Sequence, residues 1–332
     1  MSVNWNTIPR EDLRPFLVKN NWMAYQMLIC NWGLIALSFA LVIWQPAWFS
    51  IAIAMIILGG RQLGLGILTH ECAHRSFMQS SAMGEWIGTW LCGAAVFVDL
   101  ETYRRYHMTH HVKTGTSDDP DLANYANYPV HKISLVRKFI RDLFGLSGLK
   151  AMLGLIFLYA QNKDDKNSIS GYSYKKYKKP YVNVENEEEK SSNQLSICTL
   201  IYNLRRIVLV NALMFALLSS LHHPLLYLLW PVSWLTTYMV FSRIRNVAEH
   251  GALAGTRSAD TWSNTRTVAA AWWERLTVAP NFVNFHFEHH LAPTVPSYNL
   301  PALHRFLKSQ GVYERAVMEL GYLQILRRMY GE

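Results

Sequence analysis

Long apolar stretches constrain this chain more than any other feature, because a helix that crosses a lipid bilayer needs about 20 mainly apolar residues. The predicted spans cover residues 23–44, 47–69, 207–221 and 225–242. Only Gln45 and Pro46 separate the first two spans, and only residues 222–224 separate the last two. The sequence therefore predicts an all-α integral membrane protein in which four transmembrane helices form two hairpins.

The composition supports this class of protein. Charged residues make up 17% of the chain, whereas about 25% is usual in a soluble domain. The 12 Trp and 17 Tyr are residues that gather at membrane interfaces. In so apolar a chain, a net charge of +9 favours anionic lipid headgroups over nucleic acid as the partner. The four Cys have no paired spacing, which favours a reducing compartment.

Three further segments are not expected to span the membrane. Residues 84–98 are apolar but too short for a comfortable span, which predicts an interfacial or re-entrant segment. Residues 139–160 include three charged side chains and are predicted to be interfacial. Residues 161–194 are polar and are predicted to form a solvated insertion. No repeat of fixed period occurs, and residues 1–332 are predicted to form a single domain.

Positively charged residues indicate how the spans are oriented. The two tight turns contain no Lys or Arg, whereas residues 103–206 and the tail from Arg243 onward are rich in both. Such loops stay on the cytosolic side of a membrane. The polar stretch Met1–Arg14 has no apolar core and does not resemble a cleavable signal. Both termini, and a helical cap beyond the span ends, are therefore predicted to be cytosolic.

The second span carries two unusual features. Gly59, Gly60, Gly64 and Gly66 are predicted to leave room for close helix contacts. Arg61 is a charged residue inside a span, which by default suggests a functional role. The alternative is that Arg61 reaches toward the cytosol or pairs within the helix bundle.

Nine of the 13 His lie in four short clusters. Three clusters are HECAH at 70–74, HMTHH at 107–111 and HFEHH at 286–290, and the fourth is a single His in NVAEH at 246–250. Side chains at i, i+3 and i+4 lie on one side of a helix, and the predicted topology places all four clusters on one side of the membrane. The sequence therefore predicts one shared metal site whose ligands are His70, His74, His107, His110, His111, His250, His286, His289 and His290.

Nine imidazoles exceed the four ligands of a tetrahedral zinc ion and match two ions with five or six ligands each, once water is included. Neutral imidazole suits iron, zinc, copper and nickel. Two irons can bind O2, accept electrons and produce an oxidant that removes hydrogen from a CH2 group. No catalytic side chain beyond the ligands is predicted, but carboxylates are expected to hold the rings through their other N–H. The candidates are Glu71, Asp118, Asp119, Asp121, Glu249 and Glu288.

Other interpretations of the histidines explain less of the sequence. HECAH also matches the HExxH signature of zinc peptidases, in which His70 and His74 bind zinc and Glu71 acts as a base, but such an enzyme has no use for two HxxHH clusters. A metal transporter would place its ligands near the middle of the spans. A lone His is more often structural than metal-binding, and four are interpreted in this way: His131, His222, His223 and His304.

The clusters and the residues that follow them resemble those of the membrane fatty acid desaturases and their hydroxylase relatives. The resemblance rests on HECAH followed by Arg75-Ser76-Phe77, on HMTHH followed by Thr114 and Asp118-Asp119-Pro120-Asp121, and on HFEHH followed by Leu291-Ala292-Pro293 and Val295-Pro296. The clusters occur in the family's order and at similar intervals, so the resemblance covers about residues 25–310.

The resemblance implies two non-haem iron ions, O2 as co-substrate, and a fatty acyl or similar lipid chain that reaches the irons through an apolar tunnel along the spans. Two electrons would come from a separate ferredoxin, rubredoxin or cytochrome b5, because the sequence contains neither His-Pro-Gly-Gly nor a paired C-x-x-C. Asn246 resembles an asparagine that holds a metal-bound water in some desaturases.

The fourth cluster leaves the outcome of the reaction open. Asn246, Glu249, His250 and Gly251 also resemble a pattern of membrane alkane hydroxylases. Removal of a second hydrogen from the neighbouring carbon gives a double bond, whereas transfer of oxygen gives an alcohol. Placement of the substrate decides between the two outcomes. The first and third clusters favour desaturation.

Overall fold

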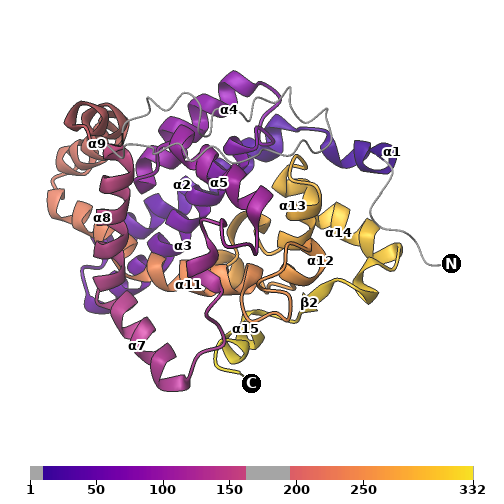
Figure 1. Ribbon diagram of the computed structural model, residues 1–332. Coiled ribbons are helices and arrows are strands. Elements are labelled where there is room, and N and C mark those ends of the chain that lie inside the picture. Colours follow the sequence, from indigo (N-terminus) through magenta and orange to yellow (C-terminus); the bar gives the residue numbers. More distant parts are fainter. Residues whose placement is uncertain (1–9, 162–194, 332) are drawn as a thin grey trace.

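The computed structural model describes residues 10–161 and 195–331. Within these ranges the chain is mostly helical (Figure 1). The predicted polar insertion lies, apart from Gln161, outside the described residues, as do residues 1–9 and 332.

Four helical stretches are long and apolar enough to cross a membrane, which agrees with the four predicted spans. They are α2 (Asn21–Trp44), α3 (Trp48–Ala73), α9 (Ile197–Ser220) and the stretch Pro224–His250. The third span begins at Ile197 rather than at Ile207, because Ser196 caps its first turn and the buried Asn203 donates to the Tyr159 carbonyl at 2.8 Å. The arrangement of these spans as two hairpins below a cytosolic cap stays a prediction.

The fourth span is broken and extends beyond its predicted end at residue 242. It consists of η5 (Pro224–Leu228), α10 (Leu229–Leu235) and α11 (Thr237–His250), and the helix breaks at Thr236. Gly148 packs so closely against the backbone of Leu235 that a Cβ atom would not fit there. The break therefore makes room for a neighbouring helix, and α11 carries His250 to its last turn.

That neighbouring helix is α8 (Leu146–Ala160), which follows α7 (Lys132–Leu143) at an angle of 67°. Gly145, at φ +76, provides the turn between them. The outward residues of α8, among them Leu149, Leu153 and Phe157, are exposed. The two helices together pass the same test of length and apolarity as the spans, so the predicted interfacial position of residues 139–160 stays a prediction.

The short apolar segment before the second histidine cluster is buried over most of its second half, whereas Trp86 in its first helix is 52% exposed. Its predicted interfacial or re-entrant position stays a prediction. The segment forms α4 (Ser81–Ile87), η2 (Gly88–Gly93) and η3 (Ala94–Val96). The indole N–H of Trp230 donates to the Ala95 carbonyl at 2.9 Å, and the Asn211 amide donates to the Ala94 carbonyl at 3.0 Å. The third and fourth spans thereby hold this segment in place.

Helix α3 lies at the centre of the molecule, and three of its four glycines make the predicted close contacts. A Cβ atom would clash with Thr237 at Gly59, with the backbone of Leu276 at Gly60, and with the Asn31 side chain at Gly64. The prediction was wrong for Gly66, because no atom lies within 4 Å of the position of its Cβ.

Gly60→Ala is expected to destabilise the protein, because backbone atoms of Leu276 cannot yield to the added methyl group. Overpacking of this kind costs about 1–3 kcal/mol. Gly66→Ala, in the same helix but in open space, is expected to gain about 0.5–1 kcal/mol from helix propensity. Thermal denaturation of the two variants in detergent measures the difference. Equal midpoints for both would contradict the close contact at Gly60.

The buried side chain of Arg61 pairs within the helix bundle, which was one of the two interpretations. Its guanidinium donates to the Arg275 carbonyl at 2.7 Å and to Asn31 Oδ1 at 3.3 Å. Arg275 belongs to η6 (Glu274–Leu276). Arg61 therefore fastens the C-terminal part of the chain to α2 and α3.

The C-terminal part contains one short parallel pair of strands, β1 (Arg266–Val268) and β2 (Val317–Glu319). Figure 1 shows α12, α13, α14 and β2 on one side of the molecule, α8 and α9 on the other, and α3, α5 and α11 between them. The remaining elements are α1 (Arg10–Leu13), η1 (Arg14–Leu17), α5 (Leu100–Lys113), α6 (Leu122–Tyr125), α12 (Thr261–Asn264), η7 (Pro280–Phe282), α13 (His286–Leu291), η8 (Ser297–Asn299), α14 (Leu300–Ser309), η9 (Val312–Glu314) and α15 (Tyr322–Arg328).

Candidate metal centre

All nine histidines of the predicted site lie together, although they come from four distant stretches of the chain. They form two groups, and within each group the potential ligand atoms lie within 4.8 Å of one another. The five-histidine group consists of His70, His74, His107, His111 and His289. The four-histidine group consists of His110, His250, His286 and His290. Their role as metal ligands stays a prediction.

Each HxxHH cluster contributes to both groups, which the sequence analysis did not foresee. On α5, His107 and His111 belong to the five-histidine group, whereas His110 belongs to the four-histidine group. Consecutive residues of a helix are rotated by about 100°, so an HH pair diverges rather than pointing one way. On α13 the division is reversed: His289 belongs to the five-histidine group, whereas His286 and His290 belong to the four-histidine group. The doubled His therefore joins the two groups into one centre.

Four of the six predicted carboxylates lie beside imidazole rings. Asp119 Oδ1 is 2.8 Å from Nδ1 of His110 and Asp121 Oδ2 is 3.7 Å from it. Glu71 Oε1 lies 3.2 Å from Nδ1 of His70, and Glu249 Oε1 lies 3.4 Å from Nδ1 of His286. Such contacts orient the rings so that Nε2 points toward the centre.

The other two carboxylates were predicted wrongly. Asp118 is exposed and pairs with Lys113 at 3.3 Å. Glu288 contacts Thr267, Tyr313 and His304 rather than a ring of the centre. His304, which was interpreted as structural, thus supports α13 through Glu288.

One hydrogen-bond partner of the histidine rings was not predicted from the sequence, because it is a backbone carbonyl. Nδ1 of His250 lies 3.0 Å from the carbonyl oxygen of Asn264. A carbonyl oxygen only accepts hydrogen bonds, so Nδ1 must carry the proton and the Nε2 of a neutral His250 carries a lone pair. Any residue type supplies such a carbonyl, so no sequence signal could reveal it.

The contacts between rings fit bound cations. Nε2 of His250 faces Nε2 of His286 at 2.8 Å, and the Nδ1 atoms of both rings are directed at oxygen atoms. Two facing lone pairs repel each other unless a cation lies near both. Nε2 of His290 is buried and has no hydrogen-bond partner among the described residues. In the five-histidine group, Nε2 of His107 lies 2.9 Å from Nε2 of both His74 and His111.

The electrostatics favour neutral rings that are ready to bind metal. Burial, followed by the charge of neighbouring rings, lowers the pKa of five histidines well below the ordinary value: His107, His111, His286, His289 and His290. Burial has the same effect on His110, but its hydrogen bond to Asp119 and the nearby acidic groups outweigh burial and raise the pKa of His110. A neutral imidazole is the form that binds a metal ion.

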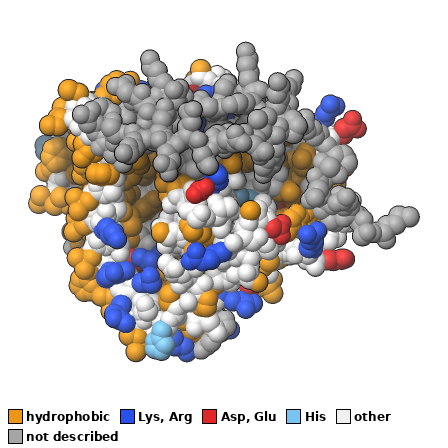
Figure 2. Space-filling model, viewed as in Figure 1, with side chains coloured by type: hydrophobic (Ala, Val, Ile, Leu, Met, Phe, Trp, Pro, Cys, Tyr) orange, Lys and Arg blue, Asp and Glu red, His pale blue; other side chains and the backbone are white. Residues whose placement is uncertain are grey.

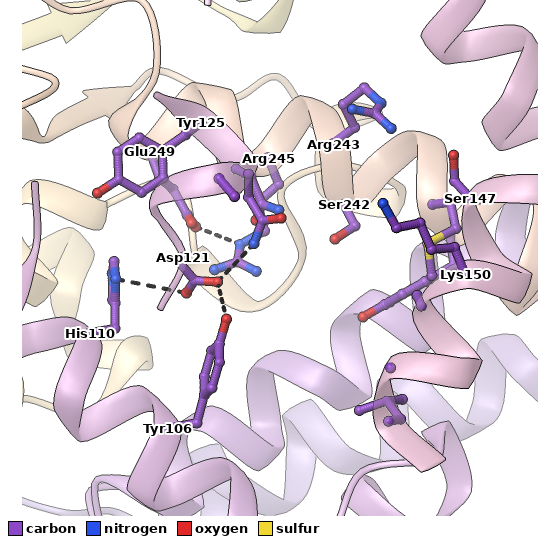
Figure 3. Close-up of a pocket in the computed structure, with 18 of the residues that line it drawn as sticks. Tyr106, His110, Asp121, Tyr125, Ser147, Lys150, Ser242, Arg243, Arg245 and Glu249 are labelled. Atoms are coloured by element: carbon purple, nitrogen blue, oxygen red, sulfur yellow. Dashed lines mark hydrogen bonds and ion pairs between the residues drawn. The ribbon is translucent and has the colours of Figure 1, made fainter. Parts of the chain in front are cut away.

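The four-histidine group borders a cavity of about 850 Å³, which is within the range of about 300–1,000 Å³ for small-ligand sites. His107, His110, His250 and His286 line one part of it, and Asn246 lies beside them. In Figure 3 a dashed line joins His110 to Asp121, which form an ion pair at 3.7 Å, and Arg245 and Glu249 lie nearby. The lining is both polar and apolar, and the predicted apolar tunnel along the spans stays a prediction.

Glu71 is placed to support the site rather than to act as a peptidase base. Its carboxylate accepts from the hydroxyl of Ser76 at 3.1 Å and from the backbone N–H of Ser297 at 2.8 Å, besides its contact with His70. It is buried, and both of its oxygens have partners.

Comparison with known proteins agrees with the resemblance. The model of the fatty acid desaturase family matches residues 43–320. The chain is 23% identical to the sn-1 oleoyl-lipid 12-desaturase of Synechocystis sp., over 93% of this chain and 82% of that protein. It is 22% identical to the dihydrorhizobitoxine desaturase of Bradyrhizobium elkanii, over 83% and 73%. A shorter match, 34% identical over 34% of this chain and 30% of the other, is to the sn-1 acyl-lipid omega-3 desaturase (ferredoxin) of Synechocystis sp..

Proposed function

Because the chain belongs to the fatty acid desaturase family and is therefore an oxidoreductase, we propose that it introduces a double bond into a fatty acyl or similar lipid chain. The reaction would use O2 and two non-haem iron ions. The observation that carries this proposal is the convergence of nine histidines into a group of five and a group of four.

Two adjacent groups fit a pair of metal ions better than a single ion. Five nitrogen donors, or four with one water, match the preference of iron for five or six ligands, whereas a structural zinc ion takes four. The zinc peptidase is disfavoured because His70 and His74 share their group with three further rings. Asn246, one turn before His250 on α11 and lining the cavity, is proposed to hold the water that completes the four-histidine group.

The overall reaction balances without any further co-reactant. The substrate loses two hydrogen atoms from neighbouring carbons, and a donor supplies two electrons together with two protons from solvent. These four electrons and four protons reduce one O2 to two waters. When bound, the iron pair supplies the oxidising equivalent that breaks the C–H bonds.

The side chains of the protein hold and orient the reacting parts. Glu71, Asp119 and Glu249 fix the rings of both groups. The cavity admits the substrate next to His110 and His250 and brings its chain within reach of the centre. Placement of this kind decides whether the second carbon also loses hydrogen.

The donor and the orientation in the membrane complete the proposal. The relative from Synechocystis that carries ferredoxin in its name supports a separate ferredoxin-type protein as the electron donor, with rubredoxin or cytochrome b5 types as alternatives. The four candidate spans support an integral multi-pass membrane protein. The active site and both termini are proposed to face the cytosol.

The hydroxylase is the alternative, because Asn246, Glu249, His250 and Gly251 match its pattern. The curated relatives described above are desaturases, which favours the double bond.

Expression of the full chain in a bacterial host, together with a ferredoxin and its reductase, tests the function. Mass spectrometry of the host lipids is expected to show acyl chains lighter by two hydrogens than in cells without the protein. A gain of one oxygen would show the hydroxylase instead. Unchanged lipids, with the protein present in the membrane and loaded with iron, would contradict an acyl-lipid substrate.

A further inference from the structure

One part of the cavity, away from the histidines, is lined by positive charge. Lys138 and Arg141 come from α7, Lys150 from α8 and Arg243 from α11. In Figure 3, Lys150 and Arg243 lie across the cavity from His110, beside the hydroxyl-bearing Ser147 and Ser242.

Most of this charge is not neutralised by the described residues. The Asp142 carboxylate is bound on both oxygens by Arg243, at 2.5 and 2.8 Å. Among residues 10–161 and 195–331, no carboxylate forms an ion pair with Lys138, Arg141 or Lys150. Burial, then the charges of Arg243 and Arg141, lower the pKa of Lys138. Cations crowded in this way are stabilised when an anion binds among them.

The outer surface of the same two helices is apolar, as expected for contact with lipid. On α7, Ile133, Val136, Ile140 and Leu143 recur on one exposed face, and Phe144 at its end is 77% exposed. Figure 2 shows Lys and Arg side chains over α7 and α8, beside hydrophobic surface. A helix with one basic and one apolar face lies at the level of lipid headgroups.

The cavity that the basic residues and the histidines line is also lined by apolar residues. Its lining includes Ala151, Leu155 and Leu158 of α8, Trp234 of α10 and Met239 of α11. A molecule with a charged head and an apolar chain would therefore match the cavity along its length.

We propose that Lys138, Arg141 and Lys150 form a subsite for the phosphate or carboxylate headgroup of the acyl substrate, whose chain extends along α8 toward the four-histidine group. Arg243, which Asp142 holds in place, lines the same end of the cavity beside these three residues. The inference rests on the proposed function, since it names the class of substrate as an anionic amphiphile.

Binding of a fluorescent phosphatidylglycerol by the purified full chain in neutral detergent tests the subsite without turnover. The triple variant Lys138→Gln, Arg141→Gln and Lys150→Gln is expected to bind at least about tenfold more weakly, because each of the three lost contacts is expected to weaken binding about threefold. The matching phosphatidylcholine probe, whose choline offsets the phosphate charge, is expected to lose less affinity in the triple variant than phosphatidylglycerol does.

A second triple variant provides the matched control. Arg137→Gln, Arg305→Gln and Lys308→Gln remove the same charge from exposed positions that do not line the cavity, and affinity for phosphatidylglycerol is expected to stay within about twofold of wild type. If the first triple variant does not fold, Lys150→Gln alone is expected to bind about threefold more weakly. Equal phosphatidylglycerol affinity of wild type and either subsite variant would overturn the proposal.

Competition distinguishes the two sources of such a headgroup. Displacement of the probe by phosphatidylglycerol vesicles alone identifies a membrane lipid, and displacement by palmitoyl-coenzyme A alone identifies a soluble thioester. Displacement by neither would overturn the subsite. Because His110→Ala is expected to retain probe binding while losing activity, a failed subsite and a failed catalytic assignment give different results.

Discussion

His110→Ala is expected to abolish desaturation and to lower the iron content of the purified protein. His110 is buried in the four-histidine group, and its loss would leave three imidazoles where four converge. Loss of a group that only hydrogen-bonds to a metal-binding ring already costs about 10–100-fold in metal affinity or activity. The loss of a ligand itself is therefore expected to cost more than about 100-fold. Lipid analysis in the expressing host and metal analysis of the same preparation measure both effects.

His223→Ala is the matched control, because His223 is exposed in the turn before η5, outside both groups. It is expected to keep wild-type activity and iron content. Full activity of His110→Ala, or an equal loss in both variants, would contradict the assignment of His110 as a ligand.

Asp119→Ala is expected to have the second largest effect, although Asp119 would not touch a metal ion. Its buried carboxylate contacts Nδ1 of His110 and the hydroxyl of Tyr125, and it accepts from the backbone N–H groups of Gly115 and Asp121. Removal frees the His110 ring and leaves buried donors without an acceptor, which costs about 1–3 kcal/mol for each group. Activity and metal affinity are expected to fall about 10–100-fold.

Asp118→Ala removes the same group from the preceding position and serves as the control. The Asp118 side chain is exposed, and its partner is the exposed Lys113, so activity and iron content are expected to remain within about twofold of wild type. Asp119→Asn is expected to lie between the two, because the amide keeps an acceptor but loses the negative charge. Comparable losses for Asp118→Ala and Asp119→Ala would show that the carboxylate at 119 has no special role.

Features that follow from local chain geometry could be predicted from the sequence. The apolar length of residues 23–44 and 47–69 identified α2 and α3, because any helix that crosses a bilayer needs about 20 mainly apolar residues in a row. The i, i+4 spacing of His107 and His111 correctly placed both rings on one side of α5, within the same group. The convergence of the nine histidines could be predicted because four clusters at helical spacing were expected on one side of the membrane, and the two groups bring the nine rings together.

Features that depend on distant contacts could not be predicted. The break at Thr236 reflects the packing of Gly148 against Leu235, which no local pattern in the fourth span reveals. The sequence also could not distinguish Asp119 from Asp118, since only the fold buries the first and exposes the second. The basic end of the cavity is formed by residues of α7, α8 and α11. In the sequence, each of these Lys and Arg residues resembles an ordinary surface charge, and only the fold brings them together.

The metal content of the purified full chain tests the central claim most directly. Elemental analysis of protein prepared from an iron-supplemented host is expected to give two iron ions per chain and little zinc, because two groups of imidazoles converge at the centre. A single zinc ion per chain, or iron that does not fall when His110 is replaced, would contradict the account.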